Sequence, residues 1–376
     1  MTKDSPELAE DSTKLATERA KTNLLLTVSY DGTYYFGMSG PMVFLTEYGI
    51  PVNCTDASLS SVSNELMKTI TLIHGYFGNK RKFKLARSEE LLKRLKSEDS
   101  SKDTSAPTSN EFEEAEEYAN RFTMIAASRT DRGVHSMGAA CQYLSFDREF
   151  NFKSLEEFQD ALNKRLPEDI RVTSVTIPPT PRFNVRHNNI GKCYIYKVDM
   201  SSDPSLFERN YYWQIMSDKH FLNTLLRKYN KVRTEFSFEK LEEAGKVFHG
   251  THNFEGYRKA SKGNERSHLI DPICTINSIE FVNNPNDKID IVVKGNRFLY
   301  KMVRCIVSHL ILAGFNVIKP DQIKATLETG SEIPNVPYAP AHGLYLKEVY
   351  FNKDVQDRID ESKKRYYERL NSVLSR

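Results

Sequence analysis

The sequence predicts an α+β protein made of two similar halves with antiparallel or mixed sheets. Segments with strand and helix character interleave in two rounds along the chain. Several neighbouring strands are joined by loops too short for a parallel crossover, which favours antiparallel pairing. At about 150 residues per domain, a length of 376 residues corresponds to roughly two to two and a half domains.

In the first half, the segment from Leu24 onward is rich in apolar, β-branched and aromatic residues, and the Asp31-Gly32 pair ends it with a turn. Apolar residues at helical spacing predict a helix over 61–74 after it. The further expected elements are strands over 122–127, 139–146 and 172–177, a loop over 128–138 and a helix over 153–164.

The second half repeats this alternation. Residues 276–282 and 288–295 form an expected hairpin, and the helix over 298–313 is expected to end in a left-handed cap at Gly314. The other expected elements are strands over 192–198 and 345–351 and helical stretches within 218–229, 238–248, 321–327 and the mixed-charge tail 353–376.

The composition excludes several classes of protein. Hydrophobic residues make up 39% and charged residues 27%, which suits a globular protein with long solvated segments. The net charge is only +3, so a nucleic-acid site would need local clustering of basic residues. The first twenty residues lack an apolar run and carry five acids, so neither a secretory nor a mitochondrial signal is predicted. The apolar runs are too short to span a membrane.

The five cysteines are scattered and contain no CxxC pair. This pattern fits neither a disulfide framework nor a zinc ribbon. A reduced compartment, the nucleus or the cytoplasm, is therefore predicted.

The polar loop from Ser128 to His135 is the sharpest chemical feature. Its Asp131 stands between Arg129 and Arg132, and Gly133 permits a tight or left-handed backbone. Flanking guanidinium groups favour the carboxylate form, which suits an anionic nucleophile or a base. The alternative is a structural Arg–Asp turn between two strands.

Further motifs accompany this loop and appear in one order along the chain. With them, the sequence resembles the tRNA pseudouridine synthase A family, the TruA-type uridine isomerases. The similarity covers Leu24 to Phe351. Its motifs are YDGTYYFG at 30–37, RTDRGVH at 129–135, LNKRLPEDIRV at 162–172, GKCYIY at 191–196, GTHNF at 250–254, FLYKMVRCIV at 298–307 and GLYL at 343–346.

The resemblance implies the pseudouridine synthase fold, in which the sheets of two related α/β halves join and flank a central, basic RNA-binding cleft. It implies that uridine in tRNA, with other RNAs as further candidates, becomes pseudouridine without a metal or cofactor. The resemblance does not decide whether the protein is a monomer or a homodimer. A polar leader, a charged insertion and the tail give the chain the style of a eukaryotic member.

The predicted organisation has four parts. Residues 1–22 form a disordered leader, 23–185 the N-terminal catalytic half, 186–352 the C-terminal half and 353–376 a helical tail. An insertion over about residues 80–120 is basic in its first part and acidic in its second. The basic part is either a contact for RNA phosphates or a solvated helix face.

The resemblance assigns three catalytic residues. Asp131 is expected as nucleophile or base, Tyr194 as the aromatic face against the extruded uracil, and Arg304 as the partner of Asp131 on the helix over 298–313. The structural alternatives are that Tyr194 is an ordinary packed strand residue and that Arg304 forms an ordinary ion pair at the end of the helix.

Further residues are expected to meet phosphates or the extruded nucleotide: Arg129, Thr130, Arg132, His135, Arg186 and Lys192. For His135, a structural histidine that fixes the loop is the competing interpretation. Ser39 stands where family members carry glutamine, and Ser308 where a glycine is common, so the choice of substrate site is open.

Two other functions compete with the enzyme. One is a catalytically inactive RNA-binding or tRNA-chaperone protein on the same fold. The other is a metal-dependent hydrolase that uses His249 and His252, although no carboxylate or cysteine stands near them in sequence. No metal site is predicted.

Overall fold

The computed structural model describes residues 17–39, 43–45, 50–52, 60–74, 121–223, 236–259 and 270–374. Of the predicted disordered leader, residues 1–16 lie outside these residues. The charged insertion of about residues 80–120 also lies outside them.

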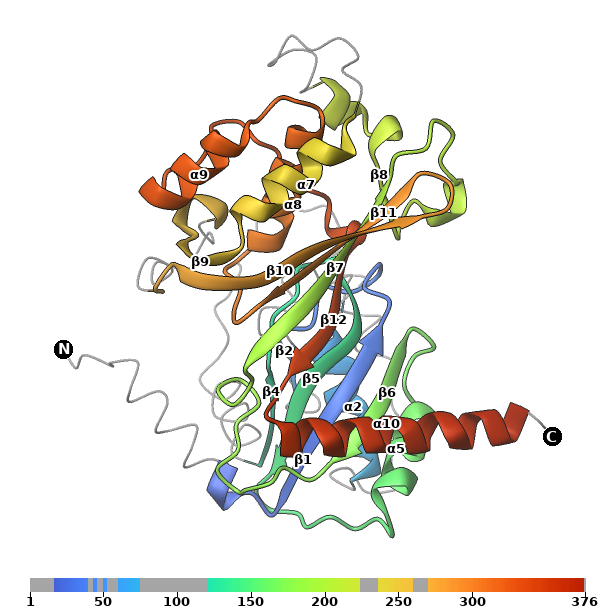
Figure 1. Cartoon of the computed structure of the whole chain (residues 1–376). Helices are drawn as coiled ribbons and strands as arrows, with labels where there is room; N and C mark the ends of the chain where they lie inside the picture. The colour runs from blue at the N-terminus through green and yellow to red at the C-terminus, as the bar shows by residue number, and fades with distance from the viewer. Residues whose placement is uncertain are drawn as a thin grey trace, which may run out of the picture.

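Within the described residues, ten strands form one mixed sheet with the order β6-β1-β5-β12-β7-β11-β10-β9 (Figure 1). In addition, β4 pairs with β5 and β8 with β7. The pairs β12–β5 and β7–β8 are parallel, and the others are antiparallel. The predicted mixed architecture is confirmed, and one sheet runs through both halves.

The strands of this sheet are β1 Thr22–Tyr30, β4 Phe122–Ala126, β5 His135–Ser145, β6 Ile170–Thr176, β7 Gly191–Asp199, β8 Trp213–Gln214, β9 Gly250–Asn253, β10 Ile273–Asn284, β11 Lys288–Gly295 and β12 Leu344–Tyr350. A separate pair consists of β2 Val43–Leu45 and β3 Ile50–Val52. The boundary predicted between residues 185 and 186 falls in the connection from β6 to β7 and stays a prediction.

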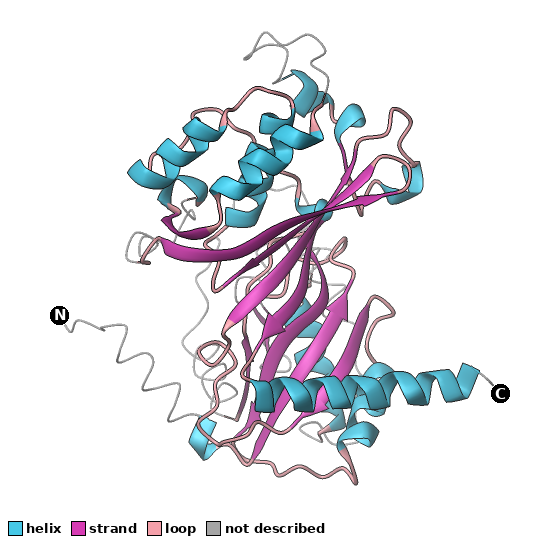
Figure 2. Ribbon diagram, viewed as in Figure 1, coloured by secondary structure: helices cyan, strands magenta, loops and turns pink. Residues whose placement is uncertain are grey.

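The helices cover the sheet in layers (Figure 2). In the view of Figure 1, α7, α8 and α9 lie above the strands of the second half, and α10 crosses in front of β1 and β6. Their bounds are α2 Val62–Ile73, α5 Leu155–Asn163, α7 Phe238–Val247, α8 Met302–Gly314, α9 Pro320–Thr329 and α10 Lys353–Leu374. Of the helix predicted within 218–229, residues 219–223 are helical and the rest lies outside the described residues.

Serine caps fix where three of these helices begin. The side chain of Ser61 accepts a hydrogen bond from the backbone N–H of Asn64 at the start of α2. Ser154 does the same before α5 and Ser237 before α7. Each cap satisfies one of the backbone donors that a helix start leaves without a partner, which explains why the predicted starts lie so close to the observed ones.

The strand β5 begins earlier than predicted. The loop expected over 128–138 ends at residue 134, because His135 and Ser136 already pair with Tyr345 and Leu346 of β12. This partner lies about two hundred residues away in sequence, so the local pattern gave no sign of it.

The helix α8 also differs from its prediction. It starts at Met302 instead of Phe298, and Gly314 is its last helical residue. The left-handed residue that follows is Asn316, with φ of 56°. Gly314 has a different function: a β-carbon there would overlap the ring of Phe236. The glycine therefore permits close packing against that ring.

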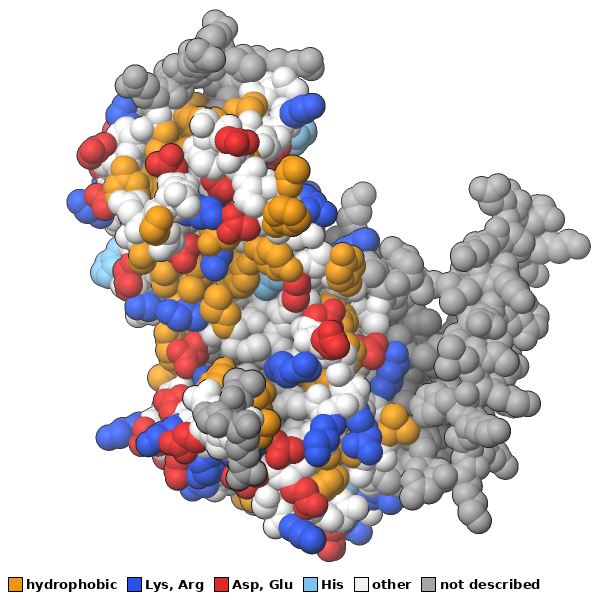
Figure 3. Space-filling view, turned by 90° about the vertical axis from the view of Figure 1, so that its right-hand side faces the viewer, with side chains coloured by type: hydrophobic (Ala, Val, Ile, Leu, Met, Phe, Trp, Pro, Cys, Tyr) orange, Lys and Arg blue, Asp and Glu red, His pale blue; other side chains and the backbone are white. Residues whose placement is uncertain are grey.

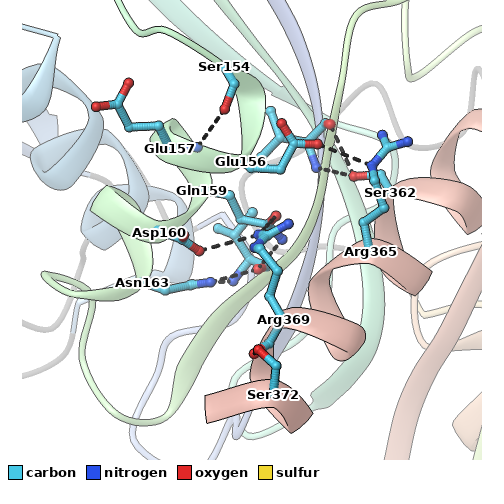
Figure 4. Close-up of polar contacts among 12 residues, drawn as sticks. Ser154, Glu156, Glu157, Gln159, Asp160, Asn163, Ser362, Arg365, Arg369 and Ser372 are labelled. Carbon is cyan, nitrogen blue, oxygen red and sulfur yellow. Dashed lines mark hydrogen bonds and ion pairs between the residues drawn. The ribbon is translucent and has the colours of Figure 1, made fainter.

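The long helix α10 is fastened to the first half by polar contacts (Figure 4). The hydroxyl of Ser362 accepts a hydrogen bond from the backbone N–H of Val175 at 3.2 Å and donates one to the carbonyl of that residue. Arg369 reaches Asp160 of α5 at 3.3 Å. The predicted helical tail is thus present, and it packs on β6.

Candidate active site

The loop between β4 and β5 is folded as a tight turn around Asp131. The backbone N–H of Val134 donates to the carbonyl of Asp131 at 3.1 Å. Gly133 has φ of 79°, a conformation that residues with a β-carbon adopt at a cost. The turn therefore needs glycine at position 133, and it presents the side chain of Asp131 at its start.

Thr130 anchors this turn to the opening motif of the chain. Its hydroxyl accepts a hydrogen bond from the backbone N–H of Met38 and contacts the hydroxyl of Tyr30, both at 2.8 Å. Gly37 has φ of 102°, and a β-carbon there would overlap the carbonyl oxygen of Thr130. Thr130, predicted to contact substrate, is buried and directs its hydroxyl into the protein.

A second glycine brings the same two motifs together. A β-carbon at Gly32 would overlap the backbone of Val134. The turn that contains Gly32 is closed by Asp31, whose carboxylate accepts hydrogen bonds from the backbone N–H and the hydroxyl of Thr33. Two motifs about a hundred residues apart thus form one structural unit.

His135 lies at the centre of this unit. The backbone N–H of Gly32 donates to Nδ1 at 3.1 Å, so Nε2 carries the proton and donates to the carbonyl of Asn210 at 2.9 Å. The ring stacks on Tyr345 with centroids 4.6 Å apart. Burial lowers the pKa of His135, although the carboxylate of Asp31 opposes this effect. These contacts match the interpretation of His135 as the residue that fixes the loop.

Asp131 forms an ion pair with Arg304 from α8. The guanidinium Nη1 lies 2.7 Å from Oδ2, and 13% of the Arg304 side chain and 21% of the Asp131 side chain are exposed. The Nε–H of Arg304 donates to the carbonyl of Ala339 at 2.7 Å. The guanidinium is therefore held at two points, and it fixes the direction of the Asp131 carboxylate.

Tyr194 reaches the same place from β7. Its hydroxyl lies 3.0 Å from the hydroxyl of Ser128, and its ring meets Phe298 edge to face with centroids 5.1 Å apart. Burial raises the pKa of Tyr194 to about 12, and the negative charge of Asp131 adds to this effect. Tyr194 is therefore protonated at neutral pH and lies near Asp131.

The structure brings the three predicted catalytic residues together from three separate elements. Sequence reasoning missed Ser128 as a partner of Tyr194. Its position two residues before Thr130 in the motif was the available signal, but a serine in a polar loop is too common to single out.

The predicted basic residues are placed differently from one another. Arg129 and Arg132 are exposed on the loop of Asp131. Desolvation lowers the pKa of Arg186, and the positive charge of Arg129 lowers it further, so these two groups lie near each other. Lys192 is buried, its ammonium donates to Oδ1 of Asn189 at 2.9 Å, and burial lowers its pKa to about 8.

The charged surface elsewhere is mixed. On the face drawn in Figure 3, acidic and basic side chains are interspersed, as the net charge of +3 implies. None of the helices in the described part of the chain has both the length and the apolar character needed to cross a bilayer.

The two histidines considered for a metal do not form a ligand cluster. The Nε2 of His252 lies 2.9 Å from the carbonyl oxygen of His249. Among the described residues, no group of three or more histidines, cysteines, aspartates or glutamates is arranged to hold a metal ion.

A carboxylate, a guanidinium and a buried tyrosine on a mixed sheet form the arrangement that the resemblance implies for an RNA uridine isomerase. The comparisons with known proteins point the same way. A family model described as tRNA pseudouridine synthase matches residues 244–352.

Known relatives extend this match. The chain is 33% identical over 226 residues to the tRNA pseudouridine synthase A of Fervidobacterium nodosum, which covers 60% of this chain and 81% of the relative. It is 34% identical over 234 residues to the tRNA pseudouridine synthase A 2 of Clostridium tetani. This match covers 61% of this chain and 81% of the relative. It is 31% identical over 237 residues to the tRNA pseudouridine synthase A of Thermotoga maritima, and this match covers 62% of this chain and 84% of the relative. The chain belongs to the tRNA pseudouridine synthase A family.

Proposed function

We propose that this protein isomerises uridine to pseudouridine in tRNA, with Asp131 as its catalytic carboxylate. The observation that carries the proposal is the convergence of Asp131, Arg304 and Tyr194 from the β4–β5 loop, α8 and β7. Membership of the family supports the reaction class.

The reaction rearranges one nucleotide without losing heavy atoms. The N1–C1′ bond breaks, the uracil turns, and a C5–C1′ bond forms. The hydrogen at C5 leaves as a proton, and N1 gains one. Asp131 acts on the sugar, either by adding to it or by removing a proton from it, and this step is reversed after the base has turned. Both routes use the same carboxylate.

Arg304 and Tyr194 support this chemistry in different ways. Arg304 stays charged and positions the carboxylate through its contacts with Asp131 and the carbonyl of Ala339. Tyr194 offers a ring to the extruded uracil and, being protonated, a hydroxyl that donates a hydrogen bond.

We assign the remaining predicted residues by what their side chains contact. The exposed Arg129, Arg132 and Arg186 are proposed to bind RNA. Lys192 is buried and its ammonium already contacts Asn189, so its expected contact with RNA stays a prediction. Thr130 and His135 are proposed to hold the loop, because their polar atoms already have protein partners. RNAs other than tRNA, the oligomeric state and a location in the nucleus or cytoplasm stay predictions.

The Asp131→Asn variant tests the proposal. It keeps the size of the side chain and removes the charge, so we expect turnover to fall at least about 10³-fold while tRNA binding persists. Tritium released from tRNA labelled at C5 of uridine measures turnover, and carbodiimide labelling with primer extension locates the product.

Two results would contradict the assignment. Wild-type turnover in Asp131→Asn would remove Asp131 as the catalytic residue. A wild-type protein that binds tRNA without releasing tritium would favour the inactive RNA-binding alternative.

A further inference from the structure

The residue before α8 has an unusual backbone. Lys301 has φ of 61° and ψ of 7°, the left-handed conformation, and its side chain makes no capping hydrogen bond. A residue with a β-carbon adopts this conformation at a cost, and such strain concentrates at functional sites. The strain alone identifies no ligand, but it directs attention to what the lysine contacts.

Lys301 lies in a group of two lysines and two tyrosines. Its ammonium lies 5.2 Å from the centre of the Tyr300 ring and 5.9 Å from that of Tyr338. The ammonium of Lys259 lies 5.0 Å from the centre of the same Tyr338 ring. The backbone N–H of Lys259 donates to the carbonyl of Tyr300 at 3.2 Å. Two distant segments of the chain thus place two cations around one ring.

This group borders the catalytic ion pair. Burial lowers the pKa of Lys301, the positive charges of Arg304 and Lys259 lower it further, and the charge of Asp131 opposes them. Partial burial raises the pKa of Tyr300 and the same carboxylate raises it further, while 46% of the residue remains exposed. The ammonium of Lys301 therefore lies within electrostatic reach of Asp131 and beside an accessible aromatic surface.

The charges in this region do not balance. Asp131 is paired with Arg304 at 2.7 Å. Among the described residues, neither Lys259 nor Lys301 has a carboxylate within ion-pair distance. Lys259 is exposed, whereas Lys301 is half-buried, so the ammonium of Lys301 bears a burial cost that no carboxylate partner offsets and that an anionic ligand would offset.

We propose that Lys301 and Lys259, whose ammonium groups both lie near the ring of Tyr338, bind a backbone phosphate of the RNA next to the extruded uridine. This inference rests on the proposed function, because the phosphate is that of the nucleotide chain entering the site of Asp131. The two tyrosine rings limit the directions open to the ammonium groups. The phosphate contact holds the sugar of the target nucleotide near the carboxylate.

The variant Lys301→Asn tests this site. Asparagine tolerates the left-handed conformation and removes the charge, so the start of α8 is preserved. We expect the affinity for an unmodified tRNA transcript to fall about tenfold at low salt. The slope of log affinity against log salt concentration should decrease by about 0.7 to 0.9, the value for one phosphate contact. Lys301→Arg should retain most of that slope.

The matched control is Lys364→Gln, which removes one positive charge from the exposed surface of α10. An equal change of slope in this control would mean that any surface lysine has the same effect, and would overturn the proposal. An unchanged slope in Lys301→Asn would also overturn it.

The failures of the two proposals are distinguishable. If the wild-type protein forms pseudouridine and Lys301→Asn keeps the wild-type affinity and slope, only the phosphate site fails. If the wild-type protein forms no pseudouridine, the proposed function fails first. A loss of turnover at saturating tRNA with unchanged affinity would place Lys301 in chemistry and not in phosphate binding, and would contradict the site as well.

Discussion

The loop of Asp131 and the start of α8 face each other across one ion pair but are built in opposite ways. In the loop and the motif it contacts, the positive φ angles fall at glycines, which adopt them without strain, and the polar atoms of Thr130 and His135 have protein partners. At the start of α8, strain is placed at Lys301, whose ammonium lacks a carboxylate partner among the described residues. The residues that hold the loop have their partners within the protein, whereas Lys301 is proposed to gain its partner from RNA.

This contrast separates two kinds of contribution. Thr130, Gly133 and His135 of the loop determine whether the carboxylate points correctly, so their loss should lower turnover or stability. Residues at the start of α8 determine how firmly RNA is held, so their loss should change affinity and its salt dependence. Arg304 belongs to both sides, because it rises from α8 and contacts Asp131.

Among the variants that test this contrast, the largest effect is expected for Arg304→Lys. Lysine keeps the positive charge but cannot contact the carbonyl of Ala339 and the carboxylate of Asp131 with the planar geometry of arginine. We expect kcat to fall by about 10²- to 10³-fold, because the carboxylate loses its fixed direction. Single-turnover kinetics at saturating tRNA measures this. Wild-type kcat in Arg304→Lys would show that a positive charge alone is enough to position the carboxylate, and would contradict the role given to Arg304.

Acid should lower the free energy of unfolding through His309 on α8. His309 is 1% exposed on α8, and burial lowers its pKa from 6.5 to about 4. The unfolded chain therefore binds a proton below about pH 6.5, whereas the folded chain stays neutral until about pH 4. The free energy of unfolding should fall over this window by about 3 kcal/mol, at about 1.4 kcal/mol per unit.

Urea unfolding at a series of pH values checks this expectation. His135 contributes in the same direction, since burial also lowers its pKa. The His309→Gln variant should flatten the pH dependence, and an equally steep dependence in this variant would assign it to other groups.

A smaller effect is expected for Thr130→Val. Valine matches the shape of threonine but leaves the N–H of Met38 and the hydroxyl of Tyr30 without their partner. The free energy of unfolding should fall by about 1 to 2 kcal/mol, and kcat should fall with it. The salt dependence of tRNA binding should not change. Thr130→Ser, which keeps the hydroxyl, is the control, and a changed salt slope in Thr130→Val would contradict the separation of the two sides.

Much of the site could be predicted from sequence because its motifs are local. The RTDRGVH loop and the strand with Tyr194 stand in continuous segments whose residue types reflect their backbone, such as Gly133 at a positive φ. The expected partnership of Asp131 and Arg304 is present at 2.7 Å.

What could not be predicted depends on contacts between distant segments. The early start of β5 requires β12, and Gly314 is explained only by the ring of Phe236. Lys301 falls within the helix expected over 298–313, but it precedes the observed helix in a left-handed conformation. Lys301, Lys259 and Tyr338 come from three separate segments of the chain, and helical spacing cannot predict that they meet.

The place of β12 in the sheet has a consequence for biosynthesis. This strand pairs in parallel with β5 and antiparallel with β7, so it closes the seam between the halves. Because β12 is made about two hundred residues after the start of β5, a nascent chain on the ribosome contains the loop of Asp131 long before the seam can form, although domains begin to fold during translation. The two halves are therefore joined only once β12 has emerged, and a polypeptide cut before this strand has Asp131 and Arg304 without the strand that joins the two halves.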